Sequence, residues 1–166
     1  MASREWDSLS DVERDTIVAL QQTVPVKLSA IARALGVRVK ASTLAPGISG
    51  ELRPDPESAG QFLIRVNRHD ASRRQRFTVA HELAHFLLHR EQIGDGIADD
   101  VLYRSSLSDR REAEANRLAS EILMPPNLIR ERLSTAQSIG VEDVVSYMAD
   151  QFEVSEAAMK IKLGMK

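Results

Sequence analysis

The sequence predicts an α+β fold, in which a small three-stranded antiparallel sheet is followed by a long helix and a helical C-terminal half. Two changes in the spacing of apolar residues predict it. Helical spacing up to about residue 36 gives way to alternation between residues 37 and 67, and helical spacing returns from about residue 72. The 166 residues suffice for one domain with a core, and no linker-like stretch divides them.

Two helices are expected before the sheet. The first begins near Ser10, which has the spacing of a capping box with Glu13, and it ends before Pro25. The second covers residues 27–36 and closes at Gly36, the residue type favoured just beyond a helix C-terminus.

Three short segments alternate apolar and polar residues as strands do: residues 37–42, 48–53 and 61–67. Pro46 and Gly47 supply the turn between the first two, and a stretch rich in proline and polar residues separates the last two. Because the segments follow one another closely, we expect each strand to pair antiparallel with the next.

After the sheet, the pattern predicts a helix from about residue 72 to residue 90 and then a polar loop over residues 91–108. The loop carries several carboxylates, which either attract a basic stretch of a substrate or are simply solvated: Glu91, Asp95, Asp99 and Asp100. A helix over residues 109–124, stopped by two prolines, comes next.

Three shorter helices are expected to complete the chain: residues 127–133, 141–152 and 155–163. Within a single domain of residues 1–166, the pattern therefore predicts three parts. They are an N-terminal helical segment (1–24), a core with the sheet and the long helices (25–126) and a C-terminal helical subdomain (127–166).

Composition and charge argue against several classes of function. With 22 basic and 24 acidic residues, the formal charge is −2, so direct nucleic-acid binding is not expected. The absence of cysteine excludes thiolate-ligated zinc and a thiol nucleophile. The N-terminus is charged and no run of about 18 apolar residues occurs, which predicts a cytoplasmic protein without a membrane span.

The most informative motif is His81-Glu82-x-x-His85, in the middle of the long predicted helix. Histidines four residues apart lie about 6 Å apart along a helix axis, so both rings can converge on one metal ion. The intervening Glu82 then lies beside the ion, where its carboxylate can accept a proton from a bound water molecule. This pattern predicts a metal site with two ligands and a general base; the alternative is two unrelated histidines on one helix.

A third ligand is needed for a catalytic zinc site. His89 continues the histidine stripe, but it is about 12 Å along the axis from His81, so the three histidines cannot share one ion. We expect His89 to make an outer contact to the site or to lie on the surface.

The predicted helix over residues 109–124 offers better candidates. Glu112 shares a face with Ala115 and Asn116, which predicts an inward position, so Glu112 is the expected third ligand. Glu114 lies on a more polar face and is the alternative ligand. Two further possibilities stay open: Glu112 could close a capping box with Asp109, and Asn116 could either hydrogen-bond a ligand or fill a polar seam.

The segments "RQRFTVAHELAHFLLH" and "EAEANRLASEILMP" together resemble the ImmA/IrrE family of zinc metallopeptidases. The resemblance includes the sheet segment and covers roughly residues 25–130. Three positions depart from the family pattern without touching a proposed ligand: Leu118 replaces an aromatic residue, Ile122 replaces leucine and Ala84 replaces glycine.

The resemblance implies a zincin-like, gluzincin-type site in which His81, His85 and Glu112 bind Zn²⁺ and Glu82 is the general base. Members of this family typically cleave or antagonise a helix-turn-helix repressor and thereby derepress mobile-element, phage or stress genes. We therefore expect a zinc metalloendopeptidase with a protein substrate of that kind. Tyr103 or His89 could stabilise the oxyanion, although Tyr103 could equally anchor a loop.

Two other functions compete with this hypothesis. The segments "LSAIARALGVRVKAST" and "FEVSEAAMKIKL" resemble parts of a helix-turn-helix, which is the pattern of a DNA- or partner-binding regulator. Against this alternative, the chain after Gly36 is rich in β-branched residues and broken by Pro46, so no recognition helix is expected there. The metal site could also belong to a non-catalytic interaction module. Glu82 favours the peptidase over the interaction module, because a site that only binds a partner needs no carboxylate beside its open position.

Overall fold

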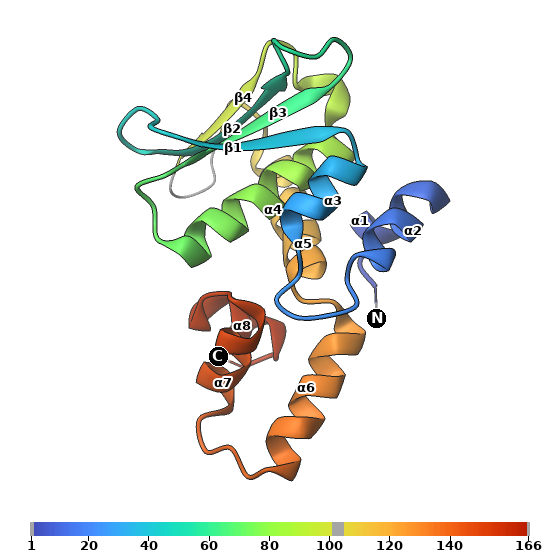
Figure 1. Ribbon diagram of the computed structural model, residues 1–166, viewed down its shortest axis with the longest axis vertical. Helices are drawn as coiled ribbons and strands as arrows, with labels where there is room; N and C mark the ends of the chain where they lie inside the picture. Colours follow the sequence, from blue (N-terminus) through green and yellow to red (C-terminus); the bar gives the residue numbers. More distant parts are fainter. Residues whose placement is uncertain (1, 101–104, 166) are drawn as a thin grey trace.

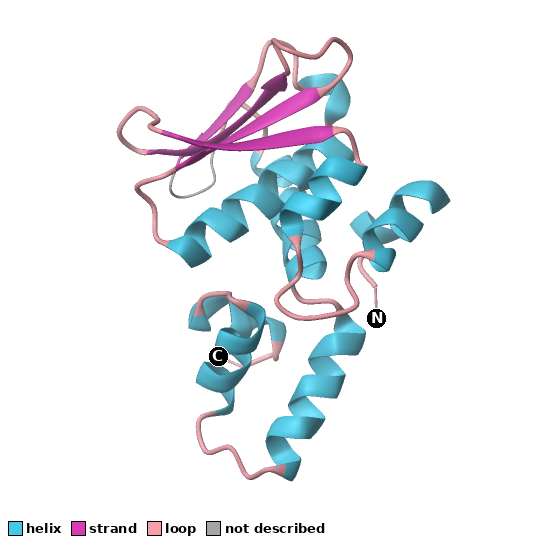
Figure 2. Cartoon of the chain, viewed as in Figure 1, coloured by secondary structure: helices cyan, strands magenta, loops and turns pink. Residues whose placement is uncertain are grey.

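The computed structural model of the protein describes residues 2–100 and 105–165. The α+β class is confirmed: a four-stranded sheet forms one layer, and helices lie against one of its faces and extend away from it (Figures 1 and 2). The strands are β1 (Val37–Ser42), β2 (Ile48–Pro54), β3 (Phe62–Asn67) and β4 (Ile97–Asp100). The helices are α1 (Arg4–Asp7), α2 (Asp11–Ala19), α3 (Leu28–Ala34), α4 (Ser72–Leu88), the short 3-10 helix η1 (Arg90–Gln92), α5 (Asp109–Leu123), α6 (Pro126–Ser138), α7 (Val144–Phe152) and α8 (Glu156–Lys162).

The capping box predicted at the start of α2 is confirmed. The Ser10 hydroxyl accepts from the Glu13 backbone N–H at 3.1 Å, and the Glu13 carboxylate accepts from the Ser10 N–H at 3.0 Å. Two orphan donors at the helix start are thus satisfied reciprocally. Gly36 follows α3 with a φ of 80°, as the predicted helix end requires.

The strand pairing differs from the prediction of three antiparallel strands. The order is β1-β3-β2-β4, and β1 pairs with β3 in parallel, whereas β2 is antiparallel to both β3 and β4. In β3 the adjacent residues Leu63 and Ile64, which face opposite ways, are both buried, as is typical of an interior strand of a sheet with parallel pairing. Alternation of residues identifies strands, but it does not specify their partners.

The fourth strand, β4, was also missed, because its residues lie in the segment predicted as a polar loop. Ile97 and Asp99 are buried on one face of β4, whereas Ala98 between them is exposed. β4 pairs only with β2, at the edge of the sheet, and this pairing is irregular between Ile48 and Gly50.

Helix α4 lies between the sheet and α5, so it is covered on several sides (Figure 1). Every residue from 78 to 86 is buried, including both histidines of the motif. Small residues let α4 and α5 approach closely, because Ala80, Ala84, Ala115 and Ala119 all have 0% exposure. This close approach brings the motif helix against the helix that carries Glu112.

The C-terminal helices α6, α7 and α8 lie on the side of α4 and α5 away from the sheet (Figure 1). Helix α3 is followed directly by β1, which confirms that no recognition helix follows the segment beginning at Leu28. Helices α7 and α8 do form a helix pair, joined at Glu153 in the left-handed conformation (φ 52°). None of the described helices combines the length and the apolarity needed to cross a bilayer.

Candidate metal centre

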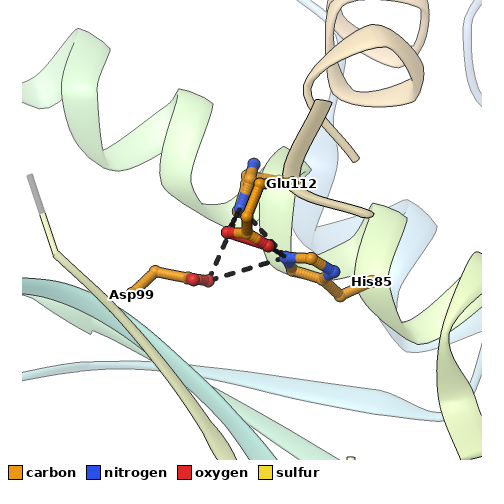
Figure 3. A group of neighbouring side chains, drawn as sticks. His85, Asp99 and Glu112 are labelled. Carbon is orange, nitrogen blue, oxygen red and sulfur yellow. Dashed lines mark hydrogen bonds and ion pairs between the residues drawn. The ribbon is translucent and has the colours of Figure 1, made fainter. Parts of the chain in front are cut away.

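Four side chains from three elements converge at the centre of the molecule (Figure 3). His81 and His85 come from α4, Glu112 from α5 and Asp99 from β4, and one ligand atom of each lies within 4.8 Å of the others. The Nε2 atoms of His81 and His85 are 3.1 Å apart, and Glu112 Oε2 lies 2.7 Å from His85 Nε2. The structure thus brings together three residues that the sequence indicated, and it adds Asp99.

The hydrogen bond on the far side of the His81 ring determines how this ring meets the centre. Asn116 Oδ1 lies 2.8 Å from His81 Nδ1. Because an amide oxygen is an acceptor, Nδ1 carries the hydrogen, and Nε2 faces the other three groups as a lone pair. Of the two possibilities open for Asn116, the structure shows the hydrogen bond to the predicted ligand.

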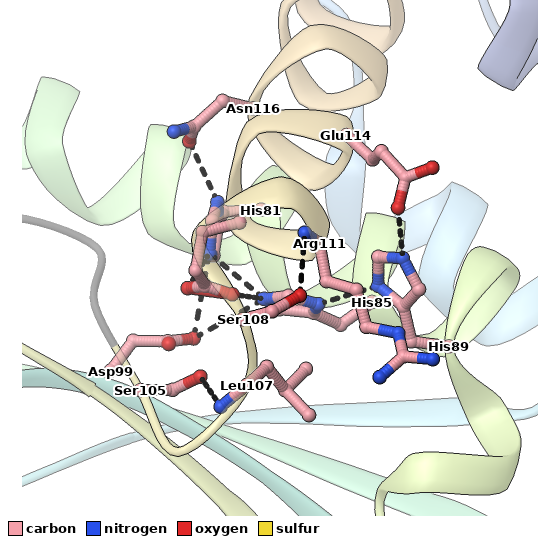
Figure 4. A network of polar contacts seen from close by, with 11 residues as sticks. His81, His85, His89, Asp99, Ser105, Leu107, Ser108, Arg111, Glu114 and Asn116 are labelled. Carbon is pink, nitrogen blue, oxygen red and sulfur yellow. Dashed lines mark hydrogen bonds and ion pairs between the residues drawn. The ribbon is translucent and has the colours of Figure 1, made fainter.

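His85 is oriented by a chain of two further residues (Figure 4). Glu114 Oε1 accepts from His89 Nε2 at 3.1 Å, and His89 Nδ1 therefore accepts from His85 Nδ1 at 2.9 Å. The Nε2 atom of His85 then also presents a lone pair to the centre. Burial lowers the pKa of His89, although the hydrogen bond to Glu114 acts in the opposite direction. The lowered pKa favours a neutral His89 ring, which this series of hydrogen bonds requires.

These contacts correct two expectations. His89 is only 5% exposed, so it is not a surface residue, and both ring nitrogens are engaged, so it does not offer a donor to an oxyanion. Glu114 contacts His89 and is not one of the four convergent groups, so the structure does not place it as a ligand. Tyr103 lies outside the described residues.

The start of α5 excludes the capping box that was the alternative role of Glu112. Ser108 is the N-cap of α5, and its hydroxyl accepts from the Arg111 N–H at 3.3 Å (Figure 4). Asp109 is therefore inside the helix, and the capping box between Asp109 and Glu112 does not form. The side chain of Glu112 is instead directed at the histidines of α4.

Glu82 lies beside the four groups with 0% exposure. Within the described parts of the chain, neither of its carboxylate oxygens has a hydrogen-bond partner. Burial raises the pKa of Glu82 well above its ordinary value, and the nearby carboxylate of Asp99 adds to this effect. A raised pKa at a buried carboxyl group is typical of residues that exchange protons.

Gly50 on β2 explains how Glu82 can lie so close to the sheet. A methyl group at this position would collide with Thr78 Cγ2 and would lie 3.6 Å from Glu82 Cγ. Glycine inside a strand often marks such a close approach. The glycine was visible in the sequence, but its partner on α4 was not.

The charges of the centre favour a bound cation. Burial raises the pKa of Asp99. Burial also acts to raise the pKa of Glu112, but the adjacent imidazoles of His81 and His85 outweigh it and hold that pKa well below its ordinary value. Among residues 2–100 and 105–165, both oxygens of Asp99 and Oε2 of Glu112 are buried without a well-directed hydrogen-bond donor.

A divalent ion is the group that these residues fit. Two imidazole lone pairs and two carboxylates converge on one region, and unpaired buried carboxylates are costly unless a cation compensates them. Imidazole nitrogen and carboxylate oxygen are ordinary ligands of zinc and related divalent metals. The observation that supports the fit is the set of buried, electron-rich atoms without donors.

A cavity of about 810 Å³ lies near His81, on the side of its ring away from the other three groups, and none of the four convergent residues lines it. Two of its lining residues lie next to His81: Asn116, which contacts Nδ1, and Phe77, whose ring stacks near the imidazole with centroids 6.5 Å apart. On its far side the cavity is lined by Ala158 and Ile161 of α8. The C-terminal helices therefore form one wall of a space beside the predicted ligand His81.

Asp99 is the member of the centre that the sequence analysis missed. It was assigned to a solvated acidic loop because its neighbours Asp95 and Asp100 are also acidic. The only local signal is its spacing of two residues from Ile97, which places both on the same face of a strand. A four-residue strand carries too short a pattern to be distinguished from a loop.

Comparisons with known proteins agree with the geometry. A family model of peptidases, described as the IrrE N-terminal-like domain, matches residues 32–164, which contain all four convergent groups. The chain is also 29% identical over 99 residues to Metallopeptidase ImmA of Bacillus subtilis (strain 168). That alignment covers 60% of this chain and 55% of the relative, so the chain spans about half the length of the curated relative it matches.

Proposed function

This chain belongs to the ImmA/IrrE family of metallopeptidases, and on that premise we propose that it is a zinc-dependent endopeptidase. The observation that carries the proposal is the convergence of His81, His85 and Glu112 beside the unpartnered carboxylate of Glu82. These are two histidines and a glutamate for the metal and one glutamate for the proton, the set that a gluzincin uses.

His81, His85 and Glu112 would hold the zinc ion through Nε2, Nε2 and the carboxylate. When bound, the ion would polarise the attacking water and the scissile carbonyl. Asn116 holds His81, and His89 with Glu114 holds His85, so that each ring keeps its lone pair directed inward. Such outer contacts fix the tautomer of a metal-binding histidine.

Glu82 would accept the proton of the attacking water and deliver it to the leaving amine. Its position next to Asp99 and its burial favour this role, because both raise its pKa toward the value at which a carboxyl group can accept and then donate a proton near neutral pH.

The substrate would be a protein, and the family suggests a helix-turn-helix repressor in the cytoplasm. The cavity near His81 is compatible with a polypeptide substrate, since Phe77, Ala158 and Ile161 in its lining suit an apolar side chain of the substrate at a distance from the scissile bond. The near-neutral charge of −2 favours a protein partner over nucleic acid.

The proposal is tested by incubating the zinc-loaded protein with helix-turn-helix repressors encoded near its gene and mapping any cut by mass spectrometry. Glu82→Gln should lower the cleavage rate by about 10²–10⁴-fold, because it removes general acid–base catalysis while the metal ligands remain. Equal zinc content of both proteins is the control. Full cleavage by Glu82→Gln would exclude the proposed role of Glu82.

One observation favours a second candidate, a metal-dependent interaction module that does not cut. Asp99 is a fourth convergent group, and sites with four protein ligands are usually structural. In that case Glu82→Gln would retain the full effect on the partner, and no cleavage product would appear with the wild-type protein.

A further inference from the structure

We infer that Asp99 is a displaceable fourth protein ligand, which would hold the metal together with His81, His85 and Glu112 and would give up its position to a small ligand such as water. This inference rests on the metal site of the proposed function. The exchange would need no co-reactant, because one carboxylate oxygen would leave the ion and one water molecule would take its place.

The position of the carboxylate supports this role. Asp99 Oδ2 lies 3.5 Å from His81 Nε2 and 3.9 Å from His85 Nε2, on the side of the centre nearest the sheet (Figure 3). Its side chain has 0% exposure, and within the part of the chain that the structure describes neither oxygen has a hydrogen-bond donor. A bound cation would stabilise an ionised carboxylate in this buried position.

The number of groups also matters. Zinc in proteins is commonly four-coordinate, and His81, His85, Glu112 and Asp99 would complete four positions. A catalytic site needs one of these positions for water. Glu82 lies beside the same region without a partner among the described residues, and a general base in this place has a purpose only if the position can open.

The strand that carries Asp99 can yield more easily than the helices that carry the other three ligands. β4 has only four residues and pairs with a single neighbour, at the edge of the sheet. Its pairing with β2 is irregular next to Asp99, between the partners of Asp100 and Asp99. Edge strands with few contacts open at lower free-energy cost than packed helices do.

The test uses the full chain loaded with Co²⁺, whose visible spectrum reports the number and type of ligands, and azide as a small probe of an open position. We would compare the wild type with Asp99→Ala and with the isosteric Asp99→Asn. Asp100→Asn is the matched control, because it changes the adjacent carboxylate, which points to the other face of β4.

We expect Asp99→Ala and Asp99→Asn to change the cobalt spectrum and to lower metal affinity by about 10–100-fold in competition with a chelator. Azide should bind both variants at least about tenfold more tightly than it binds the wild type, because in the wild type azide must first displace Asp99. Asp100→Asn should match the wild type in all three measurements. If Asp99→Ala does not fold, the comparison with Asp99→Asn decides.

An unchanged cobalt spectrum together with equal azide affinity in the wild type and the variants would overturn the inference, since the position would then be open with Asp99 present. These readouts need no proteolysis. A wild-type protein that binds metal but cuts no repressor would refute the proposed function, and the cobalt experiment would still decide the role of Asp99.

Discussion

Two buried aspartates, Asp55 and Asp99, show how differently this chain treats a carboxylate. Their side chains are 1% and 0% exposed. Asp55 accepts two hydrogen bonds from Arg38, at 3.0 and 2.9 Å, and a third from the backbone N–H of Glu57. Asp99 has histidine nitrogens and other carboxylates around it, and no donor directed at its oxygens among the described residues.

The consequence appears in the opposite shifts of the two pKa values. The hydrogen bonds from Arg38 lower the pKa of Asp55 to about 2, whereas burial raises the pKa of Asp99. Where a carboxylate serves the fold, the chain supplies its partners. At the centre the described residues direct no donor at the oxygens of Asp99, and a metal cation is the partner that fits.

The largest effect that would sharpen this contrast is the response to metal. Zinc at 100 times its Kd should raise the free energy of unfolding of the wild type by about 2.7 kcal/mol. Glu112→Ala should lose most of this stabilisation, because it removes one of the ligands. Thermal or urea unfolding with and without zinc measures both values.

Glu114→Ala is the matched comparison for that experiment, since Glu114 is on the same helix but contacts His89. It should lose less of the zinc response than Glu112→Ala, because Glu114 acts on the site only through His89 and His85. A response that vanished in Glu114→Ala and persisted in Glu112→Ala would show that the two glutamates have the opposite roles.

A smaller effect is expected when a ligand keeps its side chain but loses its orienting contact. Asn116→Ala removes the acceptor for His81 Nδ1 and should weaken zinc binding about tenfold. Competition with a chelator of known affinity measures the change. Unchanged affinity would mean that the packing of α4 alone orients the His81 ring.

Ile161→Ser should have a still smaller effect, on substrate and not on metal. Ile161 is 79% exposed and lines the cavity beside the centre, so its loss should raise KM for a cleaved repressor about fivefold through lost apolar contact. Ile139→Ser is the control, because Ile139 is 64% exposed and does not line that cavity. Equal KM values in both variants would place the substrate elsewhere.

The smallest effect concerns Asp55. Its folded pKa of about 2 lies below the ordinary value of 3.8, so its ionisation stabilises the protein above pH 4, and this contribution is lost as the pH falls toward 2. Asp55→Asn should flatten the pH dependence of the urea midpoint in this window. Arg38 is 39% exposed, so solvent weakens the pair and the change should be modest.

An identical pH dependence of Asp55→Asn and the wild type between pH 4 and pH 2 would show that the Arg38 pair contributes nothing. The zinc response should be the same in both proteins, because Asp55 is not part of the centre. Together these outcomes would distinguish the carboxylates that stabilise the fold from those that bind a metal.

Part of this architecture could be predicted because it depends on local spacing. Helix geometry alone places His81, Glu82 and His85 on neighbouring turns, and helical phase distinguishes Glu112 from Glu114 two residues later. The capping box of α2 and the glycine after α3 are likewise local, and both are present. Apolar periodicity also identified the three longer strands as strands.

Other features depend on which segments meet, and residue spacing does not carry that information. The parallel pairing of β1 with β3 joins two strands that are not consecutive in the chain, and residues 97–100 form a strand because they pair with β2. The burial of His89 depends on Glu114 from another helix.

By itself, the sequence determined the motif helix, the helix of the third predicted ligand and the α+β class, since each follows from periodicities of the backbone over one or a few turns. Only the tertiary structure decided the order of the strands, the chain of contacts through His89 and the arrival of Asp99 at the centre. The physical reason is that these features are contacts between segments far apart in the sequence, and burial of the whole core selects them together.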